Sequence, residues 1–347
     1  MRKHSKNFPT GKLKHELLAK LLNHFVSDLD IQDKRLIIGS KIGEDAAVID
    51  MGDKFLVAKT DPITFATDEI GYYVVNVNVN DVVCMGAEPK WFQSTILLPE
   101  KDTNEELIEN IFKKIHDTCK SMDITVIGGH TEITPYLNRP IVIGSLLGEV
   151  EKKKLVNSSE INSGNVLILT KGIFIEGTSI IGREKERELE HKGLSKEFID
   201  KCKNFLYDPG ISVFKEALLA NKHFKVTGFH DVTEGGVACA IAEMAMVSNT
   251  GILIEEDKIN ILPEPSKLSK IYNLNPLNTI SSGSLLIAID NQDDEASKLI
   301  EILEKNKIAA KKIGTFMTKK EGLLIKQKNG LIIPLKYSET DEITKIF

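Results

Sequence analysis

The sequence has little that would suit secretion, membrane insertion or a disulfide-stabilised fold. Only four cysteines occur among its 347 residues, and they form neither a CxxC pair nor the spacing of a disulfide framework. The longest apolar runs are far shorter than the roughly 18–20 residues that span a bilayer, and no apolar stretch follows the basic N-terminus. These absences predict a cytoplasmic protein that makes no contact with a membrane.

The chain also lacks an excess of positive charge. Its net charge is −5, and its lysine-rich stretches are short and lie beside acidic residues, so no basic field is available for nucleic acid. With 41 % hydrophobic and 27 % charged residues, the composition is that of a globular protein. A length of 347 residues suggests two domains at about 150 residues each.

Helical and strand patterns alternate along the chain and predict an α/β (α+β) protein. In the first part we expect helices over 13–25 and 104–122, and strands over 46–50, 55–59, 91–98, 124–127 and 141–147. The polar stretch 149–163 separates a second set, with strands over 166–169, 226–229 and 285–289, helices over 213–220, 236–247 and 295–305, and short strands after 309. We therefore predict two domains, 1–155 and 156–347.

The segment 75–81 is ambiguous. Its letters VNVNVND alternate with a period of two and contain β-branched residues, which favours a strand. The same segment also has helical faces, since Tyr72, Asn76 and Asn80 recur at four-residue spacing after the acidic pair Asp68-Glu69. The residues alone leave both interpretations open.

Five short motifs combine an acidic residue or a histidine with a turn or a strand end. Glycines there allow backbone N–H groups to approach phosphate oxygens, and nearby carboxylates can hold Mg²⁺ against the same oxygens. The motifs are Gly43-Glu44-Asp45-Ala46-Ala47, Thr60-Asp61, Asn80-Asp81 followed by Met85-Gly86-Ala87, Gly128-Gly129-His130-Thr131, and His230-Asp231-Val232-Thr233-Glu234-Gly235-Gly236. Together they predict a site for phosphate and a divalent metal.

Each motif taken singly has a simpler interpretation. Asp231 or Thr233 can cap the helix over 236–247, Asp45 and Asp61 can be turn residues, and His130 can be a half-buried histidine with satisfied hydrogen bonds. Neither a P-loop nor a GxGxxG motif is present. The functional interpretation therefore depends on the whole set of motifs.

In order and spacing, the five motifs resemble those of the PurM superfamily over most of the chain. This superfamily includes aminoimidazole-ribonucleotide (AIR) synthetase, the hydrogenase-maturation protein HypE, selenophosphate synthetase and thiamine-monophosphate kinase. The motif over 230–236 is most similar to the HypE form, so the chain looks like an AIR synthase-related, HypE-like protein. The resemblance favours a helix over 75–81.

The resemblance implies a two-domain PurM-like fold in which the N-terminal sheets of two subunits pair into a barrel and the C-terminal domain is α/β. It also implies a homodimer that binds ATP across its interface, and a possible maturation-factor partner. The implied Mg²⁺ ligands are Asp45, Asp81 and Asp231. The implied ATP-binding residues are Gly11, Lys12, Asp61, Asn80, Gly128, Gly129, His130 and Thr131, with Thr60, His230, Thr233 and Glu234 as further candidates.

The implied reaction is transfer of the γ-phosphoryl group of ATP to an amide- or carbonyl-type oxygen of a small acceptor. Such a reaction needs mainly positioning and cations on the phosphates, which fits a site rich in acids and glycines without a dedicated nucleophile. A small-molecule kinase of the thiamine-monophosphate kinase type is an alternative. Two further alternatives are a non-catalytic nucleotide-binding dimer scaffold and a metal-dependent hydrolase that uses His130, Glu132, His230 and Asp231.

Two departures from the family pattern bear on the acceptor. His130 stands where the kinase and HypE forms carry an acid. HypE also carries a C-terminal cysteine that accepts a carbamoyl group, whereas the last cysteine here is Cys239, in an apolar run of helical pattern. We therefore expect this chain not to perform the full HypE reaction alone.

Overall fold

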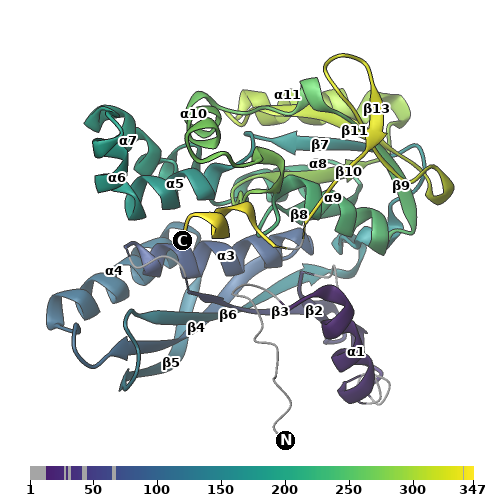
Figure 1. Cartoon of the computed structure of the whole chain (residues 1–347). Coiled ribbons are helices and arrows are strands. Elements are labelled where there is room, and N and C mark those ends of the chain that lie inside the picture. Colours follow the sequence, from purple (N-terminus) through teal and green to yellow (C-terminus); the bar gives the residue numbers. More distant parts are fainter. Residues whose placement is uncertain (1–12, 27–28, 30–32, 41–44, 65–67, 339) are drawn as a thin grey trace, which may run out of the picture.

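The computed structural model describes residues 13–26, 29, 33–40, 45–64, 68–338 and 340–347. The described chain forms two halves stacked on one another, each built around its own β-sheet, with helices packed between the two sheets (Figure 1). None of the helices in these ranges is both long enough and apolar enough to cross a membrane.

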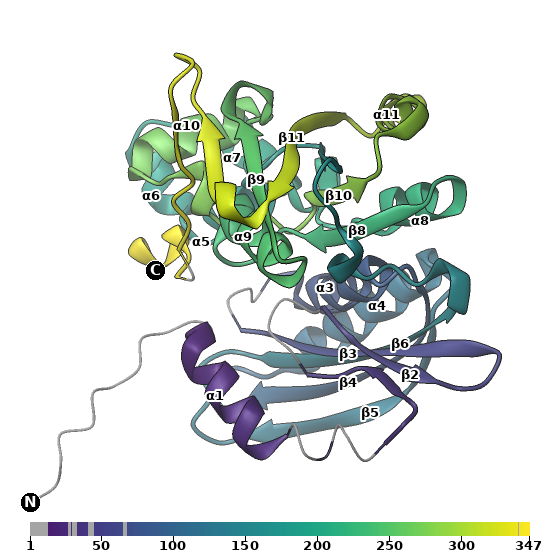
Figure 2. The ribbon, with the colours of Figure 1, turned by 90° about the vertical axis from the view of Figure 1, so that its right-hand side faces the viewer.

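The N-terminal half contains a mixed sheet, which has six strands in the described residues, in the order β1-β2-β3-β6-β4-β5. All neighbouring pairs are antiparallel except β4 and β5. Helices α3 and α4 cover the face that is turned toward the C-terminal half (Figure 2). The elements are α1 (His15–Phe25), β1 (Leu36–Ile38), β2 (Ala47–Asp50), β3 (Lys54–Ile63), α3 (Ile70–Cys84), β4 (Glu88–Pro99), α4 (Glu105–Ser121), β5 (Thr125–Thr134) and β6 (Ile141–Glu151).

The C-terminal half contains a second sheet, with seven described strands in the order β13-β12-β9-β11-β7-β10-β8. Its strands are β7 (Val166–Thr170), β8 (Val226–Asp231), β9 (Thr250–Glu255), β10 (Leu285–Ile289), β11 (Ala310–Thr318), β12 (Leu323–Lys326) and β13 (Ile332–Pro334). Its helices are α5 (Ile175–Glu184), α6 (Glu186–His191), α7 (Lys196–Asn204), α8 (Phe214–His223), α9 (Gly236–Val247), α10 (Pro263–Tyr272) and α11 (Glu295–Lys305). The predicted domain boundary at 155/156 falls between β6 and β7.

The segment 75–81, ambiguous in sequence, is helical and forms the second half of α3. Nearly all of α3 is buried, and its asparagines serve different neighbours: the Asn78 amide pairs with the backbone of Asp61 on β3, and Asn80 with the backbone of the C-terminal half. The period of two arises because polar residues are needed on opposite sides of a helix that is packed all round.

The observed strand β5 differs from the strand that we predicted over 124–127. The apolar residues 124–127 are typical of a buried strand that ends before Gly128-Gly129, but β5 continues to Thr134 and its side chains are exposed. The reason is its place at the edge of the sheet, beside β4 only. Gly129 is required there, because its φ is +152° and a Cβ atom would lie 2.1 Å from Ser94 O.

One hydrophobic core connects the two halves. Buried residues of α3, among them Val79 and Val82, belong to the same cluster as Ala217 on α8 and Phe229 on β8. Polar contacts cross the same junction: Arg183 on α5 pairs with Asp68. This continuous packing fixes how the two sheets face one another.

The C-terminal segment returns to this junction. Its last turn (Glu342–Lys345) lies below α5, close to the boundary between the halves (Figure 1). Ile343 is buried in a cluster with Phe174 and Ile181, and Ile346 packs against that cluster. The segment is thus part of the folded C-terminal half.

Candidate active site

Four of the predicted acids meet where the two halves face one another. Asp61 lies on β3 and Asp81 on α3, whereas Asp45 precedes β2 and Asp231 ends β8. Oxygen atoms of Asp45 and Asp231 and a ring nitrogen of His230 lie within 4.8 Å of one another, the one such group of potential metal ligands among the described residues. The N-terminal and C-terminal halves therefore share the site.

A lysine lies between these acids. Lys59 Nζ is 3.3 Å from Asp81 Oδ2 and 3.4 Å from Asp61 Oδ2. Burial by itself would lower the pKa of Lys59, but the nearby charges of Asp81 and Asp61 outweigh burial, so the pKa is raised and the ammonium stays charged. Lys59 is thus a fixed cation in the centre of the site.

Asp81 is one of the two buried residues among the predicted metal ligands, with Asp231. Burial raises the pKa of its carboxyl well above the usual range, and the charges of Asp231, Asp61 and Asp45 act in the same direction, while Lys59 lowers it. A divalent cation would stabilise the ionised form of Asp81 more strongly than a single lysine does. Asp81 does not belong to the group formed by Asp45, His230 and Asp231, so its role as a metal ligand stays a prediction.

His230 is held between two hydrogen-bond acceptors. Its Nδ1 lies 2.7 Å from Asp231 O, and its Nε2 lies 2.9 Å from Glu243 Oε2 on α9. A carbonyl and a carboxylate both require a donor, so the geometry favours the doubly protonated ring. Burial would lower the pKa of His230, but Asp45 and Glu243 raise it to about 10. His230 therefore serves as a cation that positions the acids, without a free nitrogen for a metal.

The site keeps an excess of negative charge. Two cations, Lys59 and His230, face five acids: Asp45, Asp61, Asp81, Asp231 and Glu243. Carboxylate oxygens are the ligands that Mg²⁺ prefers. The surplus charge and the oxygen ligands fit a divalent metal that would in turn attract the phosphates of a nucleotide.

The predicted phosphate-binding residues on β5 are not part of this cluster. Gly128, Gly129, His130 and Thr131 lie in the exposed edge strand, and His130 Nε2 is 2.9 Å from Glu132 Oε2 on the same strand. The hydrolase alternative required His130 and Glu132 to join His230 and Asp231. Among the described residues the one group of potential metal ligands lacks both β5 residues, so that alternative is not supported.

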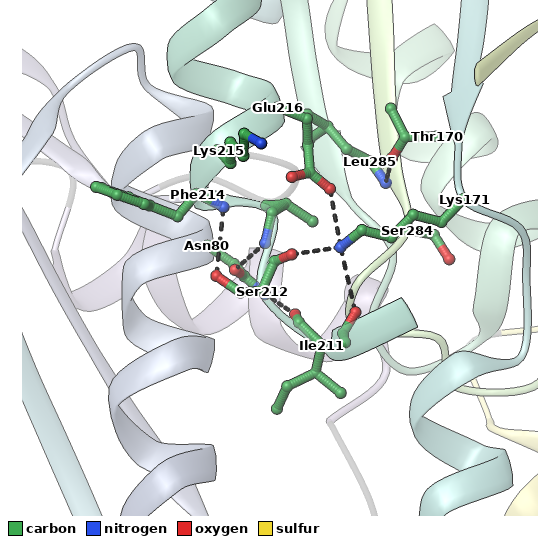
Figure 3. A network of polar contacts seen from close by, with 12 residues as sticks. Asn80, Thr170, Lys171, Ile211, Ser212, Phe214, Lys215, Glu216, Ser284 and Leu285 are labelled. Atoms are coloured by element: carbon green, nitrogen blue, oxygen red, sulfur yellow. Dashed lines mark hydrogen bonds and ion pairs between the residues drawn. The ribbon is translucent and has the colours of Figure 1, made fainter. Parts of the chain in front are cut away.

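Asn80, predicted as a nucleotide contact, is fully engaged within the protein. Its Nδ2 donates to Ile211 O at 2.9 Å, and its Oδ1 accepts from Val213 N at 2.9 Å. Figure 3 shows that Lys171, which directly follows β7, reaches the same segment. Its Nζ lies 2.5 Å from Ser212 O and 2.9 Å from Glu216 Oε1. This network joins the two halves next to the acids.

The remaining predicted site residues do not lie together. Thr60 donates its hydroxyl to Gly144 O at 2.7 Å, on the opposite face of β3 from Lys59 and Asp61. Thr233 and Glu234 lie in the turn between β8 and α9 and are half-buried. Four other residues lie outside the described residues: Gly11 and Lys12, predicted to bind ATP, and Gly43 and Glu44 of the first motif.

Sequence reasoning missed three residues that shape the site: Lys59, Asn78 and Glu243. Lys59 precedes Asp61 by two residues on a strand, and this spacing places both side chains on one face. The Asn78 amide holds the backbone of Asp61 at two points. Glu243 gave no signal in sequence, because its partner His230 lies 13 residues away on another element.

A separate cleft of about 670 Å³ lies at another part of the junction, lined by Lys54, Glu88, Lys90, Glu149 and Asn221 among others. Its charges are balanced within the protein, since Lys54 lies 2.7 Å from Glu149 Oε2 and Lys90 lies 2.9 Å from Glu88 Oε2. None of the acids of the cluster lines it. The acid cluster is therefore the stronger candidate site.

Comparisons with known proteins agree with this fold. A protein from Methanocaldococcus jannaschii named for hydrogenase expression and formation is 30 % identical over 302 residues, covering 85 % of this chain and 84 % of that protein. The crystal structure of a HypE–HypF complex is similar with a TM-score of 0.73 at 18 % identity, covering 93 % of this chain and 99 % of that chain. The structure of HypE in complex with ATP is similar with a TM-score of 0.70 at 18 % identity, covering 96 % and 97 %.

Both halves of the chain match domains of one protein family. Residues 43–150 match the N-terminal domain of AIR synthase related proteins, and residues 162–326 match the C-terminal domain. These ranges contain Asp45, Asp61 and Asp81 in the first domain and Asp231 in the second. The chain belongs to the AIR synthase related family, within the PurM and HypE superfamily.

Proposed function

We propose that this protein binds ATP with Mg²⁺ and transfers the γ-phosphoryl group to an amide- or carbonyl-type oxygen of a small acceptor. The observation that carries the proposal is the gathering of acids at the junction of the two halves. Lys59 Nζ lies 3.3 Å from Asp81 Oδ2, and oxygen atoms of Asp45 and Asp231 lie within 4.8 Å of each other. A HypE of the same fold has been solved with ATP, which supports the nucleotide. A scaffold without catalysis has no need for a charge cluster of this kind.

The residues have separate tasks in this proposal. Asp45, Asp81 and Asp231 would hold Mg²⁺, which supplies charge neutralisation for the phosphates. Lys59 offers a second positive charge to the γ-phosphoryl oxygens, because its ammonium is held between Asp61 and Asp81. The buried position of Asp81 and Asp231 also restricts water, which strengthens the electrostatic interactions of these two carboxylates.

A homodimer is the second part of the proposal. β5 is an edge strand, and among its exposed side chains Val126, Ile127 and Ile133 are apolar, with 47 %, 51 % and 51 % of their surfaces exposed. An exposed apolar edge strand is prone to pair with another chain. Pairing of two β5 strands about a two-fold axis would cover these residues and bring Gly128–Thr131 to the interface, where we propose that ATP binds.

The acceptor and any protein partner are also proposals. The M. jannaschii relative is named for hydrogenase formation, and a HypE has been solved with HypF. These names support a role in which a maturation factor delivers the acceptor. The amide-type oxygen follows from the family's chemistry.

The metal-dependent part of the proposal can be tested by thermal unfolding with ATP in the presence and absence of Mg²⁺. A ligand that binds only the folded state raises the melting temperature by mass action. Asp81→Asn is expected to reduce the Mg²⁺-dependent part of the shift, while Asp53→Asn, at an exposed position, leaves it unchanged. Equal shifts with and without Mg²⁺, or no shift with either, would refute the metal site.

The acceptor class requires a catalytic assay. ADP formation is measured with amide, amine and phosphate-ester acceptors under the same conditions. An amide that stimulates ADP release above the acceptor-free rate supports the proposal. Stimulation by a phosphate ester alone would instead indicate a small-molecule kinase.

A further inference from the structure

The turn between β8 and α9 contains two adjacent glycines in the left-handed region. Gly235 has a φ of +83° and Gly236 a φ of +67°. Glycine enters this region without steric cost, but it has other conformations of similar energy open to it. Within the turn, Gly236 N donates to Thr233 O at 3.1 Å. Because the turn begins directly after Asp231, its conformation shapes the surroundings of a predicted metal ligand.

The C-terminal segment gives this turn a hydrogen bond from outside. Asp341 is only 5 % exposed, and its Oδ2 accepts from Gly235 N at 2.7 Å. Its other carboxylate oxygen, Oδ1, accepts from Ile343 N at 2.8 Å. Hydrogen bonds to an ionised carboxylate are stronger than those between neutral groups. Asp341 therefore anchors the turn to a segment that is more than 100 residues away in sequence.

The two glycines are also closely packed. A Cβ atom on Gly235 would lie 2.7 Å from Ser338 O, and one on Gly236 would lie 2.6 Å from both Leu277 O and Thr279 N. Real Cβ atoms do not approach backbone atoms so closely. The turn is thus enclosed between the C-terminal segment and the segment that precedes β10.

The C-terminal segment is fixed at further points, and we call its residues 340–347 the strap. Glu342 Oε2 accepts from Asn275 N at 3.2 Å. Ile343 is buried in the cluster below α5, and Ile346 packs against that cluster (Figure 1). These contacts hold the strap in place, so the carboxylate of Asp341 is a fixed acceptor for the turn.

We propose that Asp341 is a positioning residue that holds the turn 232–236 in one conformation beside Asp231. The proposal rests on the function proposed above, in which Mg²⁺ and ATP bind next to this turn. Without the carboxylate, the two glycines would distribute over several conformations, and the observed one would be less populated. A ligand that binds one conformation has an apparent Kd that rises as the population of that conformation falls.

This role predicts a particular change in the kinetics of ATP use. Saturating Mg²⁺–ATP restores the binding conformation, so KM rises while kcat is kept. A substitution that only damages the fold reduces the number of active molecules, so kcat falls while KM is unchanged. The two parameters therefore separate positioning of the turn from general stability.

The test compares Asp341→Ala with Glu342→Ala by measuring ADP formation against the concentration of Mg²⁺–ATP. Both substitutions remove a carboxylate of the strap that accepts a backbone N–H, but Glu342 bonds to Asn275 and not to the turn. We expect Asp341→Ala to raise KM about fivefold or more, with kcat within about twofold of the wild type. Glu342→Ala should leave both parameters within about twofold.

Hydrogen exchange gives a second readout that does not depend on catalysis. Exchange of the Gly235 N–H is followed in a peptide that covers the turn. Since this N–H loses its acceptor in Asp341→Ala, we expect exchange about tenfold faster than in the wild type. In Glu342→Ala the rate should stay within about twofold.

Three results would overturn the proposal: a lower kcat with an unchanged KM in Asp341→Ala, equal effects of the two substitutions, or unchanged exchange of the Gly235 N–H. Should Asp341→Ala not fold, the wild-type protein decides, because a Gly235 N–H that exchanges as fast as an unprotected amide would also overturn it. A wild-type protein that forms no ADP with any acceptor would refute the proposed function. The exchange rates would then still show whether Asp341 holds the turn.

Discussion

Replacing Glu176 with glutamine is expected to stabilise the protein at pH 8. Burial, together with Asp341 and Glu234, raises the pKa of Glu176 from 4.5 to about 7. The folded state therefore holds this proton more tightly than the unfolded state, and stability falls as the pH rises from 4.5 through 7. From this difference between the two pKa values, the wild-type protein loses about 3 kcal/mol of unfolding free energy between low pH and pH 8. A protein with the uncharged glutamine does not undergo this loss.

The assay is thermal or urea unfolding of both proteins between pH 5 and pH 8. A gain of about 3 kcal/mol at pH 8 corresponds to roughly 6 °C in melting temperature for a large chain. At pH 5 the difference should fall below about 1 kcal/mol, because Glu176 is then protonated in the folded protein. Glutamine can keep the hydrogen bonds that Ser282 donates to the Glu176 side chain. The substitution therefore changes the charge of this side chain with little change in its shape.

Glu190→Gln is the matched control, since this exposed residue should give the same unfolding free energy as the wild type at each pH. A Glu176→Gln protein that is less stable than the wild type at pH 8 would contradict the assignment of an uncompensated carboxylate. A stabilisation that does not depend on pH would contradict the titration of Glu176 as its cause. If the prediction holds, the wild-type protein retains a destabilising acid, as binding sites often do.

Three further predictions concern the junction and the dimer. Lys59→Met leaves Asp81 without its cation, so we expect a loss of about 3 kcal/mol in urea unfolding that millimolar Mg²⁺ partly restores; no rescue by Mg²⁺ would count against Asp81 as a ligand. Ile127→Asp on the exposed edge of β5 should convert a dimer to a monomer in light scattering, with an unchanged circular dichroism spectrum; a wild-type monomer at micromolar concentration would rule out the dimer. Asn80→Ala should lower the unfolding free energy by about 2 kcal/mol, because Val213 N and Ile211 O lose their buried partner, and a loss below 1 kcal/mol would refute this role.

Much of the secondary structure was predictable because several elements show simple periodicity. The helices over 236–247 and 295–305 and the strand over 285–289 have the predicted bounds. The environment of β5 was not predictable. Its apolar residues 124–127 are typical of a buried strand, but they lie in an exposed strand at the edge of the sheet. Whether such a strand lies inside a sheet or at its edge is set by pairing with distant segments, which periodicity does not report.

The acids of the site were predictable for a different reason. Asp45, Asp81 and Asp231 belong to motifs at element ends, and the elements bring these ends together. Glu176 belongs to no such motif, and its letters, IEGTSI, look like an ordinary first helical turn. Its significance depends on burial and on two acids from distant segments, Glu234 and Asp341, which only the fold brings near it.

The residues of the proposed site come from both halves of the chain. The N-terminal half supplies Asp45, Asp61, Asp81 and Lys59, while the C-terminal half supplies Asp231. A metal bound to Asp81 and Asp231 would link α3 to β8, which already share one hydrophobic core. Because that core is closely packed, the acids are held in place without a ligand, and in the proposed reaction this would favour catalysis by preorganised electrostatics. The Asn80 and Lys171 networks next to the acids maintain this alignment, so substitutions there should affect the site without touching it.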